Sequence, residues 1–297
     1  MQVATKLFYD RASVALSTLS GRADTLQTQI ATGKPLHAAS DDSVAYTRLQ
    51  GLARASADSE VTAKNLDLAA AVLAQADTTL GAISNQLTQA KTLAIQARNG
   101  TLSGTARQAI ADELDEIVAQ LVVLGNTTDA RGEPLFGGAD GGAAVTANAD
   151  GSFTFASTLP GAIPTGDDGT IQPGDTAARI FAQTGGDTLT TIKALSAALR
   201  TNTSLDAAAA TTITDLGTAA TQVLSVQASL GARGQRVEMD QAALKQSGID
   251  REALRSGLED TDITAAITDL QKTMTILSAT QASFTKLQGL SLFDYLR

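Results

Sequence analysis

The stretch ITAAITDLQKTMTILSATQASFTKL, residues 263–287, carries the most regular hydrophobic pattern in this 297-residue chain. Its apolar positions, with one glutamine among them, recur at intervals of three and four residues, which places them along one side of an α-helix. Three residues just before it, 260–262, offer side-chain oxygens that can cap a first helical turn. We therefore predict a long amphipathic helix near the C-terminal end. Its stripe comprises Ile263, Ile267, Leu270, Met274, Leu277, Gln281, Phe284 and Leu287.

A similar stripe lies near the beginning of the chain. Gly33 can adopt the left-handed conformation that follows a helix, and Pro35 cannot donate a hydrogen bond within one, so this helix is predicted to end there. The two ends of the chain thus predict a helical hairpin. The N-terminal stripe comprises Phe8, Ala12, Leu16, Leu19, Ala23, Leu26 and Ile30.

The flanks inside these terminal helices are also predicted to be helical, because four of the five prolines lie between Pro134 and Pro173. Residues 40–42 supply capping oxygens and negative charge for a long helix that Asn99-Gly100 ends. At 1.5 Å per residue this helix is about 85 Å long. The steps of four and three between apolar residues over 110–124 predict another helix.

In the second half, Asp187 is placed to cap a short helix that runs through Leu199. Thr203 and Asp206 resemble a capping box that opens the next helix. We expect Gly248 to interrupt that helix, since glycine is a poor helix former.

The window between the helical flanks has a different composition. Residues 131–186 hold 12 of the 25 glycines and four of the seven phenylalanines. Asp150-Gly151, a pair favoured in two-residue turns, separates two segments that are predicted to be strands, 143–149 and 152–156. The window therefore predicts a small β-rich insert.

The predicted fold is mainly α: a long antiparallel helical bundle or coiled coil built from both chain ends, with a small β-rich inserted domain. The terminal segments are predicted to serve assembly and the middle segments to form the bundle and the outer insert. The predicted boundaries are 1–34, 35–130, 131–186, 187–259 and 260–297.

Composition excludes several functions. The chain has 22 basic and 31 acidic residues, a net charge of −9, which argues against nucleic acid as a partner. It has no cysteine, so disulfides and thiolate sites are excluded. We find no uninterrupted apolar run near the N-terminus that would indicate a cleaved signal peptide, and no run of about 18 apolar residues that would predict membrane insertion.

The residues of known catalytic and metal-binding motifs are missing. His37 is the only histidine, so a histidine pair for zinc cannot form, and its setting predicts a surface or packing role. Residues 148–151 resemble a calcium loop only faintly and are better explained as a hairpin turn. Gly137-Gly138 and Gly141-Gly142 lack the spacing of a phosphate-binding loop. We therefore expect neither catalytic residues, nor a metal, nor a cofactor.

The terminal helices raise the question of what covers them. A two-helix hairpin with an alanine-rich stripe buries little area, so either the ends pack against the long helices or other copies and partner subunits cover them. The second interpretation makes the terminal stripes an assembly interface. Its candidate residues are Phe8, Leu16, Leu19, Leu26, Ile30, Ile263, Ile267, Leu270, Met274, Leu277, Phe284, Leu287, Leu292 and Phe293.

Several segments resemble the flagellin superfamily. On the N-terminal side these are LQTQIATGK (26–34), ASDDSVA (39–45), ARNGTL (97–102) and GNTTDARGEPLFGG (125–138). The C-terminal segments LEDTDI (258–263), QASF (281–284) and LSLFDYL (290–296) resemble the hook-associated protein 3 family more than filament flagellins. The motif positions carried over are Ser40, Asp41, Asp42, Asn126, Thr127, Thr128, Asp129, Leu135, Phe136 and Gly138.

The resemblance implies a structural subunit at the junction between the flagellar hook and the filament. It implies as partners further copies of the chain, the first hook-associated protein, flagellin, and an export chaperone that binds the C-terminal region. It also implies secretion through the flagellar type III apparatus without a cleaved signal. Two alternatives remain: a flagellin that forms the filament itself, and a soluble coiled-coil adaptor or signalling module.

Overall fold

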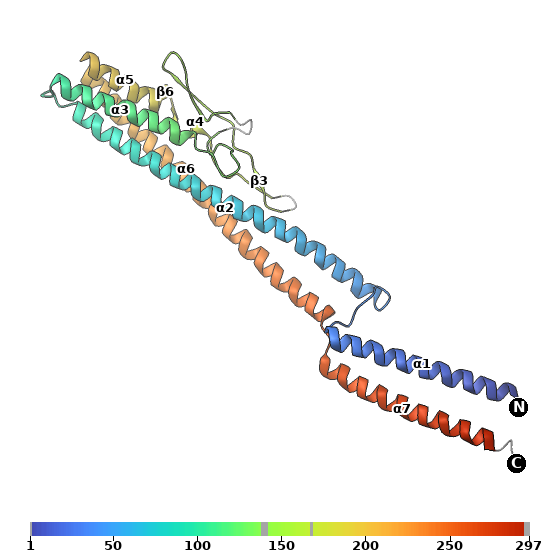
Figure 1. Cartoon of the computed structure of the whole chain (residues 1–297). Helices are drawn as coiled ribbons and strands as arrows, with labels where there is room; N and C mark the ends of the chain where they lie inside the picture. The colour runs from blue at the N-terminus through green and yellow to red at the C-terminus, as the bar shows by residue number, and fades with distance from the viewer. Residues whose placement is uncertain (1, 138–141, 167–168, 294–297) are drawn as a thin grey trace. The chain divides into compact units, whose positions relative to one another are not determined.

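The computed structural model describes residues 2–137, 142–166 and 169–293. Within this range, no side chain is described for residues 2–6, 8 and 287–293. Among these described residues helices dominate, and short strands occur only in the middle of the chain (Figure 1). The helices are α1 (Gln2–Thr32), α2 (Ser43–Ala97), α3 (Gly104–Gly125), α4 (Ala177–Phe181), α5 (Thr188–Thr201), α6 (Leu205–Glu259) and α7 (Ile263–Phe293). The strands are β1 (Val145–Ala147), β2 (Phe153–Phe155), β3 (Ile163–Pro164), β4 (Thr170–Ile171), β5 (Ala182–Gln183) and β6 (Gly186–Asp187).

The chain forms two compact units. Unit 1 combines both chain ends, Met1–Ala57 and Ser247–Arg297, and unit 2 is the continuous segment Asp58–Gln246. The long helices α2 and α6 contribute to both units, because each boundary falls inside one of them.

In unit 1, α1 and α7 lie side by side and run in opposite directions (Figure 1). This confirms the helical hairpin expected from the terminal stripes. α1 ends where it was predicted to end, because Gly33 adopts a φ of 70°. The carbonyl of Gly33 accepts a hydrogen bond from the amide of Thr261 (2.9 Å), and Lys34 pairs with Glu259. The connections into α2 and α7 are therefore tied to each other.

Unit 2 has a helical core. Leucine, isoleucine and alanine side chains of α2, α3, α5 and α6 form one buried cluster. α3 packs on α5, and the hydroxyl of Ser196 donates to the carbonyl of Ala111 (3.1 Å) across them. Arg200 adds two surface contacts, since its Nη2 lies 2.7 Å from the carboxylates of both Asp112 and Asp115.

The insert consists of small antiparallel hairpins, as its composition predicted. β1 and β2 pair with Val145 opposite Phe155, and Gly151 in the turn has a φ of 87°. The ring of Phe155 stacks on Phe181 of α4, with 5.7 Å between centroids. Leu135, Phe136, Val145 and Phe181 belong to the same buried cluster as the helices. The insert therefore shares the core of unit 2.

Two expectations about α6 were wrong. The helix continues through Gly248 as far as Glu259. A glycine costs a helix only about 1 kcal/mol, and with no proline in this segment the hydrogen-bonding ladder is maintained. The capping box at its start does not form either: the Thr203 hydroxyl donates to the carbonyl of Thr201, and Ser204 adopts a φ of 51°.

We expected no segment of the chain to be apolar enough to span a membrane, and α2 corrects this expectation. A window of this helix is long and apolar enough, and poor enough in charge, to pass a length-and-composition test for a membrane span. Of that window, 44% is buried inside the fold, and the core helix of a soluble protein passes the same test. The alanine-rich core face of α2 explains the result.

Candidate assembly surface

The face of α1 that contacts α7 is the stripe read from the sequence. Ala23 is buried, and Leu16, Leu19, Leu26 and Ile30 are half-buried. Together with Tyr9 and Ala12 they follow alternating steps of three and four residues, the repeat of a coiled-coil seam. Of the predicted assembly residues in α1, only the side chain of Phe8 lies outside the described residues.

The predicted stripe of α7 is split by the structure. Leu270, Leu277 and Phe284 are half-buried toward α1, and the ring of Phe284 meets Tyr9 edge to face at 5.5 Å. The seam is completed by Ala266 and Thr273, which the stripe read from the sequence did not include and which are buried. A third small residue, Thr280, follows them on the same face. The inner face of α7 thus uses small residues at several positions.

Three large apolar residues of the predicted α7 stripe remain outside this seam. Ile263 is 48% exposed, Ile267 41% and Met274 50%. At 3.6 residues per turn they lie about 60–100° around the helix from Ala266. We call Ile263, Ile267 and Met274 the outer stripe. The side chains of Leu287, Leu292 and Phe293 lie outside the described residues.

Charge is distributed unequally between the two units. Unit 1 contains 11 acidic and 11 basic residues, whereas unit 2 contains 20 acidic and 11 basic ones. The whole net charge of −9 therefore belongs to unit 2. Identical copies of unit 1 can approach each other without net repulsion, whereas copies of unit 2 repel.

The motif residues at the start of α2 organise the connection from α1. Asp42 caps the helix, since its Oδ1 accepts hydrogen bonds from the amides of Val44 and Ala45 at 2.9 Å. Asp41 turns back and accepts from the amides of His37 and Ala38, also at 2.9 Å. These two amides are the main cause of a lowered pKa for Asp41, and the neighbouring Ser40 hydroxyl contributes. The role of these residues is local folding.

The second motif joins the end of α3 to the insert. The side chain of Asn126 donates to the carbonyl of Val145 (2.8 Å) and accepts from its amide (2.9 Å), as a neighbouring strand would. The carbonyl of Thr128 accepts from Gln75 of α2 (2.9 Å), and that of Thr127 accepts from the amide of Leu135 (2.9 Å). Leu135 and Phe136 are fully buried, and Gly138 lies outside the described residues.

Asp129 is the polar centre of this second motif. Its Oδ1 accepts from the amides of Arg131 (2.8 Å) and Glu133 (3.0 Å), and its Oδ2 binds the Arg131 side chain. Burial of the carboxylate acts to raise its pKa, but the hydrogen bonds from Arg131 and Glu133 outweigh burial. The pKa of Asp129 therefore lies below the usual 3.8.

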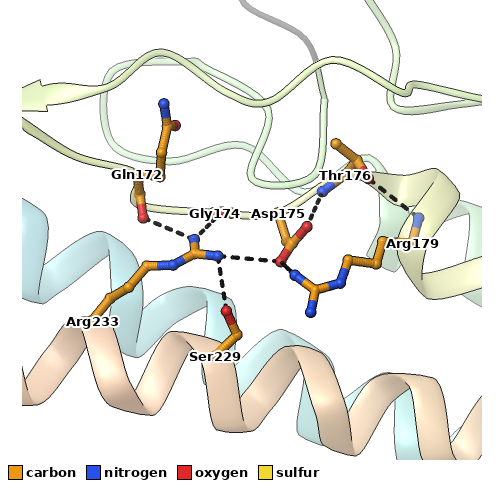
Figure 2. A network of polar contacts seen from close by, with 7 residues as sticks. All are labelled: Gln172, Gly174, Asp175, Thr176, Arg179, Ser229 and Arg233. Atoms are coloured by element: carbon orange, nitrogen blue, oxygen red, sulfur yellow. Dashed lines mark hydrogen bonds and ion pairs between the residues drawn. The ribbon is translucent and has the colours of Figure 1, made fainter.

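An ionic cluster around the buried Asp175, which the sequence did not predict, anchors the insert to α6 (Figure 2). Asp175 lies between two arginines: its Oδ2 is 2.7 Å from Nη1 of Arg179 and 3.3 Å from Nη2 of Arg233. Arg233 also donates to the carbonyls of Gln172 (3.0 Å) and Gly174 (2.5 Å) and to the hydroxyl of Ser229 (3.0 Å). No local sequence signal marks this contact, because Asp175 and Arg233 come from distant segments.

The described residues contain no group of three or more histidine, aspartate or glutamate side chains that could hold a metal ion. His37 is exposed, and its Nε2 lies 3.2 Å from the hydroxyl of Thr32. The candidate features for assembly are a terminal hairpin with few buried side chains, the exposed outer stripe and the neutral unit 1.

Comparison with known proteins assigns the family. The bacterial flagellin N-terminal helical region matches residues 8–140, and the bacterial flagellin C-terminal helical region matches residues 213–296. Together these regions cover most of the chain, which belongs to the flagellin superfamily.

Within this superfamily, the chain is similar over its whole length to flagellar hook-associated protein 3 of Salmonella typhimurium. The identity is 26% over 325 residues, covering 99% of both chains. Two solved structures share the fold. One is assigned to the flagellar hook-associated proteins of Vibrio parahaemolyticus, with a TM-score of 0.70, 20% identity, and coverage of 74% of this chain and 100% of that one. The other is flagellar hook-associated protein 3 of Legionella pneumophila, with a TM-score of 0.61, 17% identity, and coverage of 70% and 98%.

Proposed function

We propose that this chain is a structural subunit of the bacterial flagellum that self-assembles into a tubular layer and joins the hook to the filament. Its neighbours in this proposal are further copies of the chain, the first hook-associated protein on the hook side and flagellin on the filament side. The whole-length similarity to flagellar hook-associated protein 3 supports a position of this layer between the hook and the filament.

The observation that carries the proposal is the incomplete burial of the terminal hairpin. α1 and α7 together extend over 62 residues, 31 in each. Among those whose side chains are described, only Ala23, Ala266 and Thr273 are buried. Packing of so few small side chains contributes little free energy, so neighbouring subunits supply the missing contacts. A head-to-tail contact of this kind repeats into a ring or tube.

The proposal extends to export and to chemistry. The subunit leaves the cell through the flagellar type III apparatus without a cleaved signal, and an export chaperone covers the C-terminal helix until assembly. The subunit has no catalytic activity, so its function lies in packing rather than in a reactive site.

A flagellin that forms the filament itself is the nearest alternative. It would share the flagellin-type helical regions, but the whole-length match to a hook-associated protein favours the junction. The two functions differ in where the subunit is found: at one boundary of each flagellum, or along its whole length.

Localisation by a single introduced thiol tests the proposal. The chain lacks cysteine, so Ser157→Cys, at an exposed position of the insert, gives one labelling site. We expect maleimide-coupled gold in one band between hook and filament. Label along the whole filament would establish the alternative. Full-length filaments on cells that lack the gene would refute both.

A further inference from the structure

Unit 1 contains an apolar groove between α2 and α6, with a volume of about 530 Å³. Most of its surface is apolar: Leu254 is 61% exposed, and Leu52 and Leu258 are half-buried. The groove residues are Arg48, Gly51 and Leu52 of α2 and Ala253, Leu254, Gly257 and Leu258 of α6.

Two glycines line this groove, and the packing around them does not require glycine. A Cβ added to Gly51 or Gly257 would meet no atom within 4 Å, and neither residue has a positive φ. Glycine inside a helix costs about 1 kcal/mol relative to alanine. Without side chains at these two positions, another protein segment can approach the backbone of α2 and α6 closely, which gives a physical reason for the glycines.

The same chain carries an exposed apolar surface of similar chemistry and spacing. Ile263 and Ile267 of the outer stripe lie one helical turn apart, as do Leu254 and Leu258 in the groove. Each pair therefore spans about 6 Å along its helix. Both surfaces are exposed within the subunit: α7 packs on α1 through its other face.

Charge favours a second copy of the chain as the occupant. Unit 1 has equal numbers of acidic and basic residues, so two copies of it approach without net repulsion. Arg48 at the groove makes no ion pair with any described residue. Asp260 and Asp262, at the beginning of α7, bring negative charge next to Ile263. This negative charge is complementary to the positive charge of Arg48.

We infer that the groove of one subunit binds the outer stripe of α7 of a second copy. This inference rests on the proposed self-assembly and specifies which surfaces meet. The contact is heterologous, because the groove and the stripe are different surfaces, so it repeats from subunit to subunit.

Cross-linking between two single-cysteine variants tests this contact. We produce two variants together in flagellated cells, Leu254→Cys and a size-tagged Ile267→Cys, and oxidise the isolated flagella. A disulfide requires Cα atoms within about 7 Å. We therefore expect this pair to give about tenfold more mixed dimer than a control pair of Leu254→Cys with Val123→Cys. Val123 is 70% exposed on α3, in unit 2, and serves as the control position. Equal yields from the two pairs would overturn the inference.

A second variant fills the groove without disturbing the fold. The Cβ of Gly257→Leu would meet no atom within 4 Å, and the same holds for Gly248→Leu, a matched control on the same helix outside the groove. We expect about tenfold weaker incorporation for Gly257→Leu, because the occupant is excluded sterically. Equal incorporation of both variants would refute the groove contact and leave the junction function standing. Absence of the unmodified chain from the junction would instead refute the function.

Discussion

Asp175 and Arg233 form an ion pair (3.3 Å) that joins the insert to α6, although 58 residues separate them in the chain. The side chain of Asp175 is only 2% exposed, and that of Arg233 is 23% exposed. Arg179 contacts the same carboxylate oxygen at 2.7 Å, so the buried negative charge faces two positive ones. This cluster ties the loop before α4 to a helix that reaches into unit 1.

Replacement of Asp175 tests the strength of this anchor. We expect Asp175→Asn to lower the free energy of unfolding by about 3 kcal/mol, because it leaves the Arg233 guanidinium partly buried without a counter-charge. Asp58→Asn, at an exposed position of α2, is the control and should change stability by less than about 0.5 kcal/mol. Urea unfolding followed by far-ultraviolet circular dichroism measures both. Equal stability of the two variants would show that the cluster does not anchor the insert.

Gly174, next to Asp175, allows a close approach of two backbone segments. A Cβ at this position would lie 2.0 Å from the carbonyl oxygen of Leu135, so a backbone segment must move. We expect Gly174→Ala to destabilise the chain by about 2 kcal/mol and to lower the midpoint of thermal unfolding. Gly161→Ala is the matched control in the insert, because its Cβ would meet nothing within 4 Å. An unchanged midpoint for Gly174→Ala would contradict the observed packing.

The lowered pKa of Asp129 should make the stability of the fold depend on pH. Because this pKa lies below the usual 3.8, the ionised carboxylate contributes its full stabilisation of the folded state above pH 3.8. The stabilisation is then lost as the pH falls through the folded pKa. We expect Asp129→Asn to cost about 2 kcal/mol near neutral pH and progressively less below about pH 3.8. Urea midpoints of both proteins over this pH range measure the difference. A constant difference down to the lowest pH would exclude Asp129 as the titrating group.

The terminal hairpin predicts fast hydrogen exchange in the free subunit. Few side chains of α1 and α7 are buried, whereas the helices of unit 2 share a continuous core. We expect amides of residues 2–31 and 263–293 to exchange about a hundredfold faster than those of α3, and to become protected in isolated flagella. Mass spectrometry of peptides from both states measures this. Strong protection in the free subunit would mean that the hairpin is stable without neighbours.

Helices, their ends and the first hairpin could be predicted from the sequence because the interactions that determine them are local. Gly33 ends α1, Asp42 caps α2 and Asp187 caps α5 through contacts that span at most a few residues. β1 and β2 form a hairpin around Asp150-Gly151 as predicted, because turn chemistry depends on adjacent residues. The loop has three residues instead of the expected two, since the amide of Asn148 donates to the carbonyl of Ser152. Gly248 does not interrupt α6, because the weak local preference of glycine against helix is outweighed by the continuity of the helix.

Contacts between distant segments required the tertiary structure. Apolar spacing placed Ile263, Ile267 and Met274 on the same stripe as Leu270, but α7 turns small residues toward α1 and leaves these three exposed. Helical periodicity identifies a side of a helix only to within a broad arc, and the partner helix selects the face that packs closely. The pairing of Asn126 with Val145 likewise depends on how α3 meets the insert.

By itself, the sequence determined a mainly helical chain with an insert, its local caps and turns, and a composition without cysteine and with a single histidine, since these depend on composition and near neighbours. Only the tertiary structure decided that Asp175 meets Arg233, that unit 1 is neutral while unit 2 carries the net charge, and which apolar residues remain uncovered. Those features depend on which distant segments come together, and no local pattern encodes that choice.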